Sequence, residues 1–86
     1  MTLEEINSLE ANTRLYLVAP DFSVVPINVA AVSRNSDNSL KLALIVSAIN
    51  SGKSVCVSPK ALREFYRDKK EAKAASRKLR RNALKF

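Results

Sequence analysis

The sequence contains no histidine and no tryptophan, and it has one cysteine and one glycine among 86 residues. A lone cysteine cannot form a disulfide within the chain, and without histidine or a second cysteine the usual ligands of a zinc site are missing. No carboxylate pair and no nucleophile beside a base stands out either. We therefore expect no catalytic residues, no enzymatic activity, no metal site and no cofactor.

Long apolar runs are also missing, because no stretch of 18 apolar residues occurs. The sequence thus predicts no transmembrane helix. The N-terminus carries Glu4 and Glu5 and has no basic residue before Arg14, which is unlike a signal or transit peptide. We expect a cytoplasmic protein that does not bind membranes. Cys56 stands between two valines, which favours a small core residue over a reactive thiol.

The single glycine, Gly52, opens the tripeptide GKS, which also ends phosphate-binding loops. Such a loop requires another glycine five residues earlier, and that position is Ser47. The spacing therefore excludes a phosphate-binding loop, and we interpret the tripeptide as a connecting turn.

Charge is distributed very unevenly along the chain. Residues 1–58 contain four basic and five acidic side chains, whereas residues 59–86 contain eleven basic and three acidic ones. A steep asymmetry of this kind indicates an anionic partner such as nucleic acid. The chain is short enough for a single domain, which we divide into an α+β body (1–58) and a basic amphipathic helix (59–86).

Hydrophobic periodicity predicts an α+β fold with a small sheet of about three strands, a short helix and the long basic C-terminal helix. Thr2 to Glu5 has capping-box spacing and predicts a short helix. Residues 14–19 and 23–33 alternate and predict a hairpin, in which Val25, Ile27, Val29 and Ala31 share one face. Pro26 would make the second strand an edge strand or one that starts with a bulge.

The segment 40–49 is ambiguous, because apolar residues occupy both faces of either a helix or a strand. We favour a helix, since Ser39 stands at an N-cap position and Gly52 lies just past the end. A strand remains open because several residues are β-branched. Residues 54–57 predict a further short strand.

A continuous helix is predicted over 59–86, because Ser58 can cap it, Pro59 suits its first position and no glycine or proline follows. One arc of this helix is apolar: Ala61, Leu62, Phe65, Ala72, Leu79, Ala83 and Phe86. The opposite arc is basic, while Lys69, Lys73 and Arg80 flank the apolar side. We expect Leu62, Phe65 and Tyr66 to pack against the sheet and the part beyond Ala72 to project.

The function that this pattern favours is nucleic-acid binding through the phosphate backbone. A helix that is merely solvated also has a basic arc, but such arcs usually mix both signs of charge. RNA is favoured over DNA, because arginine-rich helices bind irregular RNA and no helix-turn-helix is recognisable. Tyr16 and Phe22 can stack on bases, but the pattern favours core packing or a role in a turn for each of them. The predicted nucleic-acid-binding residues are Arg63, Arg67, Lys70, Lys73, Arg77, Lys78, Arg80, Arg81 and Lys85.

The alternative is a protein-binding module or inhibitor that uses the long helix for self-association or for an acidic groove on a partner. Apolar and small residues occur at heptad spacing, although a lysine and a serine interrupt them: Leu62, Phe65, Lys69, Ala72, Ser76, Leu79, Ala83 and Phe86. A homo-oligomer is therefore a second expectation. Membrane-surface binding ranks third, because the outer half of the helix lacks bulky apolar residues.

The layout of a small α+β body with LALIVSAINSGKSVCV, followed by SPKALREFYRDKKEAKAASRKLRRNALKF, resembles the short accessory proteins of large lytic phages. Some members of that group are RNA-binding inhibitors of host defence toxins. The resemblance implies that RNA binding and inhibition of a nuclease toxin can occur together in one protein.

Overall fold

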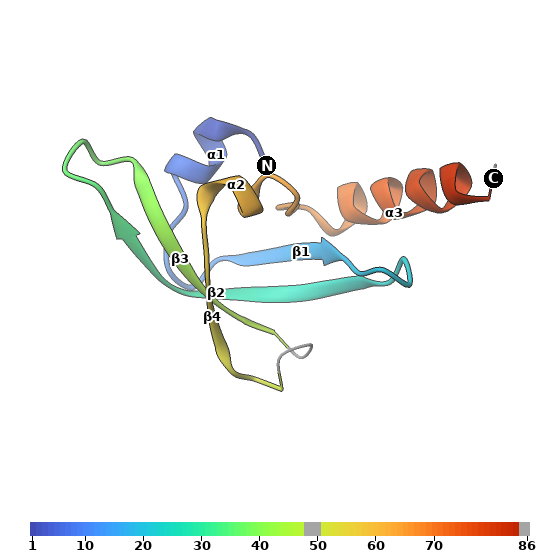
Figure 1. Ribbon diagram of the computed structural model, residues 1–86, viewed down its shortest axis with the longest axis horizontal. Coiled ribbons are helices and arrows are strands. Elements are labelled where there is room, and N and C mark those ends of the chain that lie inside the picture. The colour runs from blue at the N-terminus through green and yellow to red at the C-terminus, as the bar shows by residue number, and fades with distance from the viewer. Residues whose placement is uncertain (48–50, 85–86) are drawn as a thin grey trace.

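The computed structural model describes residues 1–47 and 51–84 and shows an α+β fold built on a four-stranded antiparallel sheet (Figure 1). The strands follow one another in the order β1-β2-β3-β4. The predicted fold class is confirmed, with one strand more than expected. The elements are α1 (Leu3–Asn7), β1 (Arg14–Val18), β2 (Val24–Arg34), β3 (Leu40–Ser47), β4 (Ser54–Val57), α2 (Pro59–Leu62) and α3 (Lys69–Ala83).

The capping box predicted for α1 is present. The backbone N–H of Glu5 donates to Thr2 Oγ1 (3.2 Å), and the N–H of Thr2 donates to Glu5 Oε1 (2.9 Å). After the helix, the guanidinium of Arg34 donates to the carbonyls of Asn7 (2.5 Å) and Leu9 (2.6 Å). Both ends of this short helix thus have partners for backbone groups that the helix itself leaves unpaired.

The predicted hairpin is confirmed as β1 and β2, but two details differ. The register shifts between Val29 and Ala31, so that Val29 pairs with Ile45 and Ala31 pairs with Leu44. Because a bulge inserts one residue, Ala31 lies on the face opposite to Val29, and the prediction that they share a face is wrong.

The second difference concerns Pro26, because β2 lies between β1 and β3 and is no edge strand. Pro26 pairs with Tyr16, whose own N–H and carbonyl bond instead to Tyr66 (2.8 Å each). Pairing with the described part of β3 begins at Ile27. Neither neighbour described here requires an N–H from Pro26, which explains why the ladder tolerates a proline.

The helix favoured over 40–49 is wrong, since residues 40–47 form strand β3 and positions 48 and 49 lie outside the described residues. Alternate residues Ala43, Ile45 and Ser47 are buried, and β2 and β4 pair with the strand on either side. This pairing overrides the local helical signals. Gly52 is left-handed as expected (φ 77°), but it adjoins left-handed Ser51 (φ 55°) in the β3–β4 connection and ends no helix.

The main core lies on one face of the sheet, beneath α1 and α2 (Figure 1). Its most deeply buried side chains come from α1, from α2 and from the two strands of the hairpin: Ile6, Leu15, Ile27, Val29 and Leu62. Phe65 completes this core with 5% of its surface exposed. The predicted packing of Leu62 and Phe65 is therefore confirmed, and Tyr66 beside them is half-buried.

The continuous helix predicted over 59–86 is wrong, because residues 63–68 are not helical and separate α2 from α3. Phe65 enters the core, and Tyr66 forms an antiparallel bridge with Tyr16 at the free edge of β1. A straight helix cannot satisfy both contacts. Asp68 then restarts the helix as an N-cap, its carboxylate accepting the N–H of Lys70 (2.9 Å).

Candidate nucleic-acid interface

Helix α3 lies against β1 and the beginning of β2 through a face of small residues (Figure 1). Ala72 is fully buried, and Ser76 is nearly so. The hydroxyl of Ser76 donates to the backbone carbonyl of Phe22 at the tip of the hairpin. Ala72 does not belong to the main core cluster, so α3 is held by a separate and smaller contact.

The cations of α3 are all exposed to solvent. The helix carries seven of them and a single acid, Glu71: the cations are Lys69, Lys70, Lys73, Arg77, Lys78, Arg80 and Arg81. Within residues 1–47 and 51–84, the only ion pair joins Arg67 to Glu5, at 3.9 Å between Nη1 and Oε2. No carboxylate of the described chain therefore neutralises a cation of α3.

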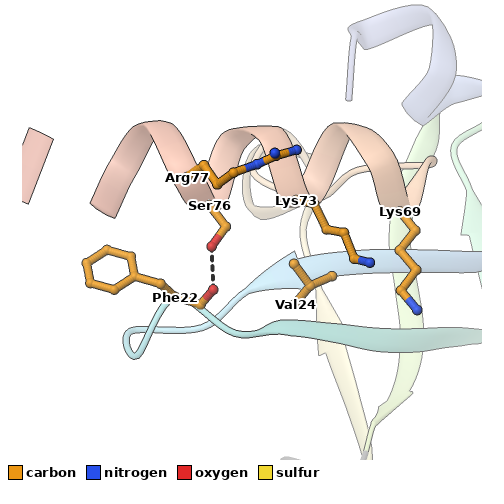
Figure 2. A pocket seen from close by; sticks show the side chains of 6 residues that line it. All are labelled: Phe22, Val24, Lys69, Lys73, Ser76 and Arg77. Carbon is orange, nitrogen blue, oxygen red and sulfur yellow. Dashed lines mark hydrogen bonds between the residues drawn. The ribbon is translucent and has the colours of Figure 1, made fainter. Parts of the chain in front are cut away.

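Three of these cations line a groove between α3 and the hairpin (Figure 2). Lys69, Lys73 and Arg77 follow one another four residues apart, which aligns them along one side of the helix. Phe22 and Val24 from the hairpin form the opposite wall, and Ser76 closes the hollow between them. Its volume is about 660 Å³, and none of its lining residues is acidic. We call this hollow the basic groove.

A second hollow, of about 370 Å³, lies on α3 alone and is lined by Ala74, Arg77, Lys78 and Arg81. Arg77 therefore borders both hollows. Of the residues predicted to bind nucleic acid, the structure brings Lys73, Arg77, Lys78 and Arg81 together around these two hollows. Lys70 and Arg80 are exposed on the same helix, and Lys85 lies outside the described residues.

The two remaining predicted residues do not join this cluster. Arg63 is the C-cap of α2 and lines a different hollow with Leu17 and Leu79, while Arg67 faces Glu5. Their separation from the α3 cations follows from the break between the two helices, since a continuous helix would have aligned them.

Sequence reasoning did not assign Lys69 or Val24 to the site, and for Phe22 it favoured a packing or turn role over base stacking. The spacing of Lys69, Lys73 and Arg77 was visible as an i, i+4, i+8 row. Nothing in the sequence placed this row beside the tip of a hairpin more than 40 residues away in the chain. That neighbourhood arises because the Tyr16–Tyr66 bridge sets the start of α3 at the edge of β1.

The heptad seam proposed for self-association is largely occupied within the chain. Leu62 and Phe65 are buried in the main core, and Ala72 and Ser76 are buried against the hairpin. Leu79 is half exposed, and Phe86 lies outside the described residues. The buried residues are therefore not free to pair with a second helix unless α3 leaves its place.

A separate apolar surface lies on the sheet, on the face opposite to the main core. Leu42, Leu44, Ala31 and Cys56 line a shallow hollow of about 200 Å³ there. Leu42 is 39% exposed, and Cys56 is exposed as well, so the prediction that Cys56 is a core residue is wrong. Cys56 pairs with Leu44, whose side chain alternates away from buried Ala43 and Ile45. We call this surface the apolar sheet face.

In the part of the chain that the structure describes, no helix combines the length and the apolar character needed to cross a membrane. The resemblance to phage accessory proteins stays a prediction. No protein-family model matches this chain, and no curated protein and no solved structure matches it either.

Proposed function

We propose that this protein binds nucleic acid through the phosphate backbone, using the cations of α3. The observation that carries the proposal is the seven exposed cations on one 15-residue helix, which have no acidic partner among the described residues. Such an array costs self-repulsion in the free protein. A polyanion removes this repulsion and releases counterions as each lysine or arginine contacts a phosphate.

The manner in which α3 is docked supports this proposal. The helix uses Ala72 and Ser76 for its contact with the hairpin, and the long basic side chains all remain exposed. A helix that served only to cover the sheet would be expected to carry bulky apolar residues on its inner face.

RNA is the favoured nucleic acid. Three of the α3 cations are arginines, whose planar guanidinium groups contact phosphates in bidentate fashion. Helix α2 has only four residues, which is too short for the first helix of a helix-turn-helix preceding α3. Irregular or single-stranded RNA accepts a basic helix without such a scaffold.

The test compares charge reversals at two places. Arg77→Glu, Arg80→Glu and Arg81→Glu together should abolish binding of a fluorescent RNA measured by anisotropy. The matched control Lys41→Glu, Lys53→Glu and Lys60→Glu changes net charge by the same amount on exposed residues outside α3, and it should bind nearly as well as wild type. Equal losses in the two triple variants would contradict a role for α3.

Salt dependence provides a second readout. If about six cations contact phosphates, the logarithm of the affinity should fall with the logarithm of salt concentration at a slope of about −4 to −5.5. Matched RNA and DNA oligonucleotides measured at one salt concentration decide the preference between them. A salt-insensitive complex would argue against phosphate contacts.

The apolar sheet face favours a second function, protein binding or self-association. Leu42 and Leu44 are apolar residues on the outer side of the sheet, and exposed apolar patches often mark interfaces. This surface replaces the helical seam as the place for such a partner. Leu42→Lys should leave the fold intact and dissociate any dimer detected by analytical ultracentrifugation; a dimer that persists would place the interface elsewhere.

A further inference from the structure

The β1–β2 turn and the β2–β3 turn share their hydrogen-bonding pattern, but they have different residues at the one position whose backbone is left-handed. In 19–23 and in 35–39, the N–H of the first residue donates to the carbonyl of the fifth (2.8 Å in both). The N–H of the fourth residue donates to the carbonyl of the first (2.8 and 2.9 Å). This fourth residue is left-handed in both turns: it is Asn38 (φ 70°) in one and Phe22 (φ 68°) in the other.

Phenylalanine is an unusual choice for this backbone conformation. Asparagine tolerates positive φ, as does glycine, whereas a bulky side chain is unfavourable there. Phe22 is half-buried and does not belong to the main core cluster, so core packing does not explain its presence. Backbone strain of this kind concentrates at binding sites, where the position of the side chain matters more than local stability.

The strained residue stands at the basic groove. Figure 2 shows Phe22 at one end of the groove, with its ring directed away from the lysines, and Lys69 at the other end; Lys69 and Lys73 point toward the hairpin, whereas Arg77 extends along the helix. Successive cations are separated by one helical step of four residues, which is about 6 Å along the axis. This step is similar to the separation of neighbouring phosphates along one nucleic-acid strand. The groove therefore combines an aromatic ring at one end with cations from three successive turns of the helix.

We propose that the basic groove binds single-stranded nucleic acid, with the Phe22 ring stacking on an unpaired base while Lys69, Lys73 and Arg77 contact consecutive phosphates. This inference rests on the proposed function and adds strandedness and a base contact to it. In a duplex, each base is stacked between its neighbours and paired at its edge, so a protein ring has no free face to contact. Stacking accepts any base, so the proposal requires no sequence preference.

The acidic residue nearest to the ring in the chain, Asp21, does not line the groove. Its carboxylate accepts hydrogen bonds from the N–H (3.1 Å) and the hydroxyl (2.6 Å) of Ser23. The Ser76 hydroxyl is likewise engaged with the Phe22 carbonyl. Both contacts hold the turn, and therefore the ring, in position beside α3.

The experiment measures anisotropy of a labelled oligo(U) of about 12 nucleotides, alone and annealed to oligo(A). Wild type should prefer the single strand. Phe22→Asn gives this turn the residue that the 35–39 turn has at the same position, Asn38. This variant should retain or raise the melting temperature. Its affinity for the single strand should fall about 5- to 150-fold, with duplex binding unchanged. Phe22→Leu should lose affinity similarly, and Phe22→Trp should retain it.

The possible outcomes separate this inference from the proposed function. If Lys73→Glu with Arg77→Glu weakens binding while the Phe22 variants bind both probes like wild type, the stacking proposal is overturned and phosphate binding stands. A preference for the duplex also overturns it. If Phe22→Asn melts earlier and Phe22→Leu binds normally, the ring is a packing group and the proposal is again overturned. If wild type binds neither probe, both proposals fail.

Discussion

At the scale of single residues, several polar side chains act on the backbone near them, and Glu5 is the clearest case. The N–H of Thr2, followed by the Thr2 hydroxyl, hydrogen-bonds the carboxylate and lowers the pKa of Glu5 from its ordinary value of 4.5, with a smaller contribution from Arg67. A lowered pKa in the folded state means that the charged form stabilises the fold. This contribution is present above pH 4.5 and is lost as the pH falls through the folded-state pKa.

The first prediction follows from the lowered pKa of Glu5. Wild type should lose stability as the pH falls below 4.5, and Glu5→Gln should remove part of this acid sensitivity. Hydrogen bonds from Ser23 and Ser39 also lower the pKa of Asp21 and of Asp37, so the relevant quantity is the difference between wild type and variant. Urea denaturation followed at a series of pH values measures it. Parallel pH profiles for the two proteins would show that the capping carboxylate contributes nothing.

The second prediction concerns Phe65, which is 5% exposed and joins the α2–α3 connection to the core. Phe65→Ala should lower the free energy of unfolding by about 3 to 5 kcal/mol, because it deletes a buried ring and leaves a cavity. Thermal and urea denaturation provide the measurement. Leu84→Ala is the control, since Leu84 is 79% exposed and its removal should change stability little. A similar effect in both variants would contradict the assigned packing.

At the scale of the elements, α3 is attached to the sheet by small side chains and by the single hydroxyl of Ser76. Tight contact through small residues leaves no space for a larger one. The helix also lies outside the main core, so its docking should be separable from the stability of the body.

The third prediction uses this separation. Ala72→Leu should destabilise the docked helix by about 1 to 3 kcal/mol through overpacking. Hydrogen exchange should then accelerate in α3 while the amides of β2 and β3 stay protected. Ala74→Leu places the same side chain on an exposed position of the same helix and should leave exchange unchanged. If Ala72→Leu also exposes the sheet, α3 belongs to the main folding unit.

At the scale of the whole molecule, the buried apolar residues and the excess of positive charge lie in different parts of the chain. Every residue of the main core cluster precedes Tyr66, whereas the seven cations of α3 follow it. The buried core and the α3 cations thus come from different segments of the chain. This agrees with the division of charge in the sequence, although the boundary lies near residue 66 and not at 58.

The fourth prediction tests this organisation by deleting residues 77–86. The main core cluster is untouched, so the truncated protein should fold with a circular dichroism spectrum that loses only helical signal. Its affinity for RNA should fall sharply, because Arg77, Lys78, Arg80 and Arg81 are removed. RNA binding as tight as that of the intact chain would refute the proposed role of α3. Loss of folding would mean that the second half of α3 stabilises the body.

The sequence by itself determined the features that depend on near neighbours in the chain. The capping box at Thr2, the alternation of the hairpin, the strand at 54–57 and the excess of positive charge after Pro59 are all visible in short windows. These signals were sufficient to predict the fold class and to assign most of the α3 cations to the candidate interface. They rest on backbone hydrogen bonds and periodicities that span only a few residues.

Only the tertiary structure decided the features that depend on distant partners. Segment 40–47 became a strand because β2 and β4 pair with it on both sides, and the predicted long helix was broken because Tyr66 pairs with Tyr16. The same bridge brings the row of Lys69, Lys73 and Arg77 to Phe22. Contacts between residues about 50 positions apart leave no periodic pattern in the chain, so the basic groove exists only once the sheet edge has positioned α3.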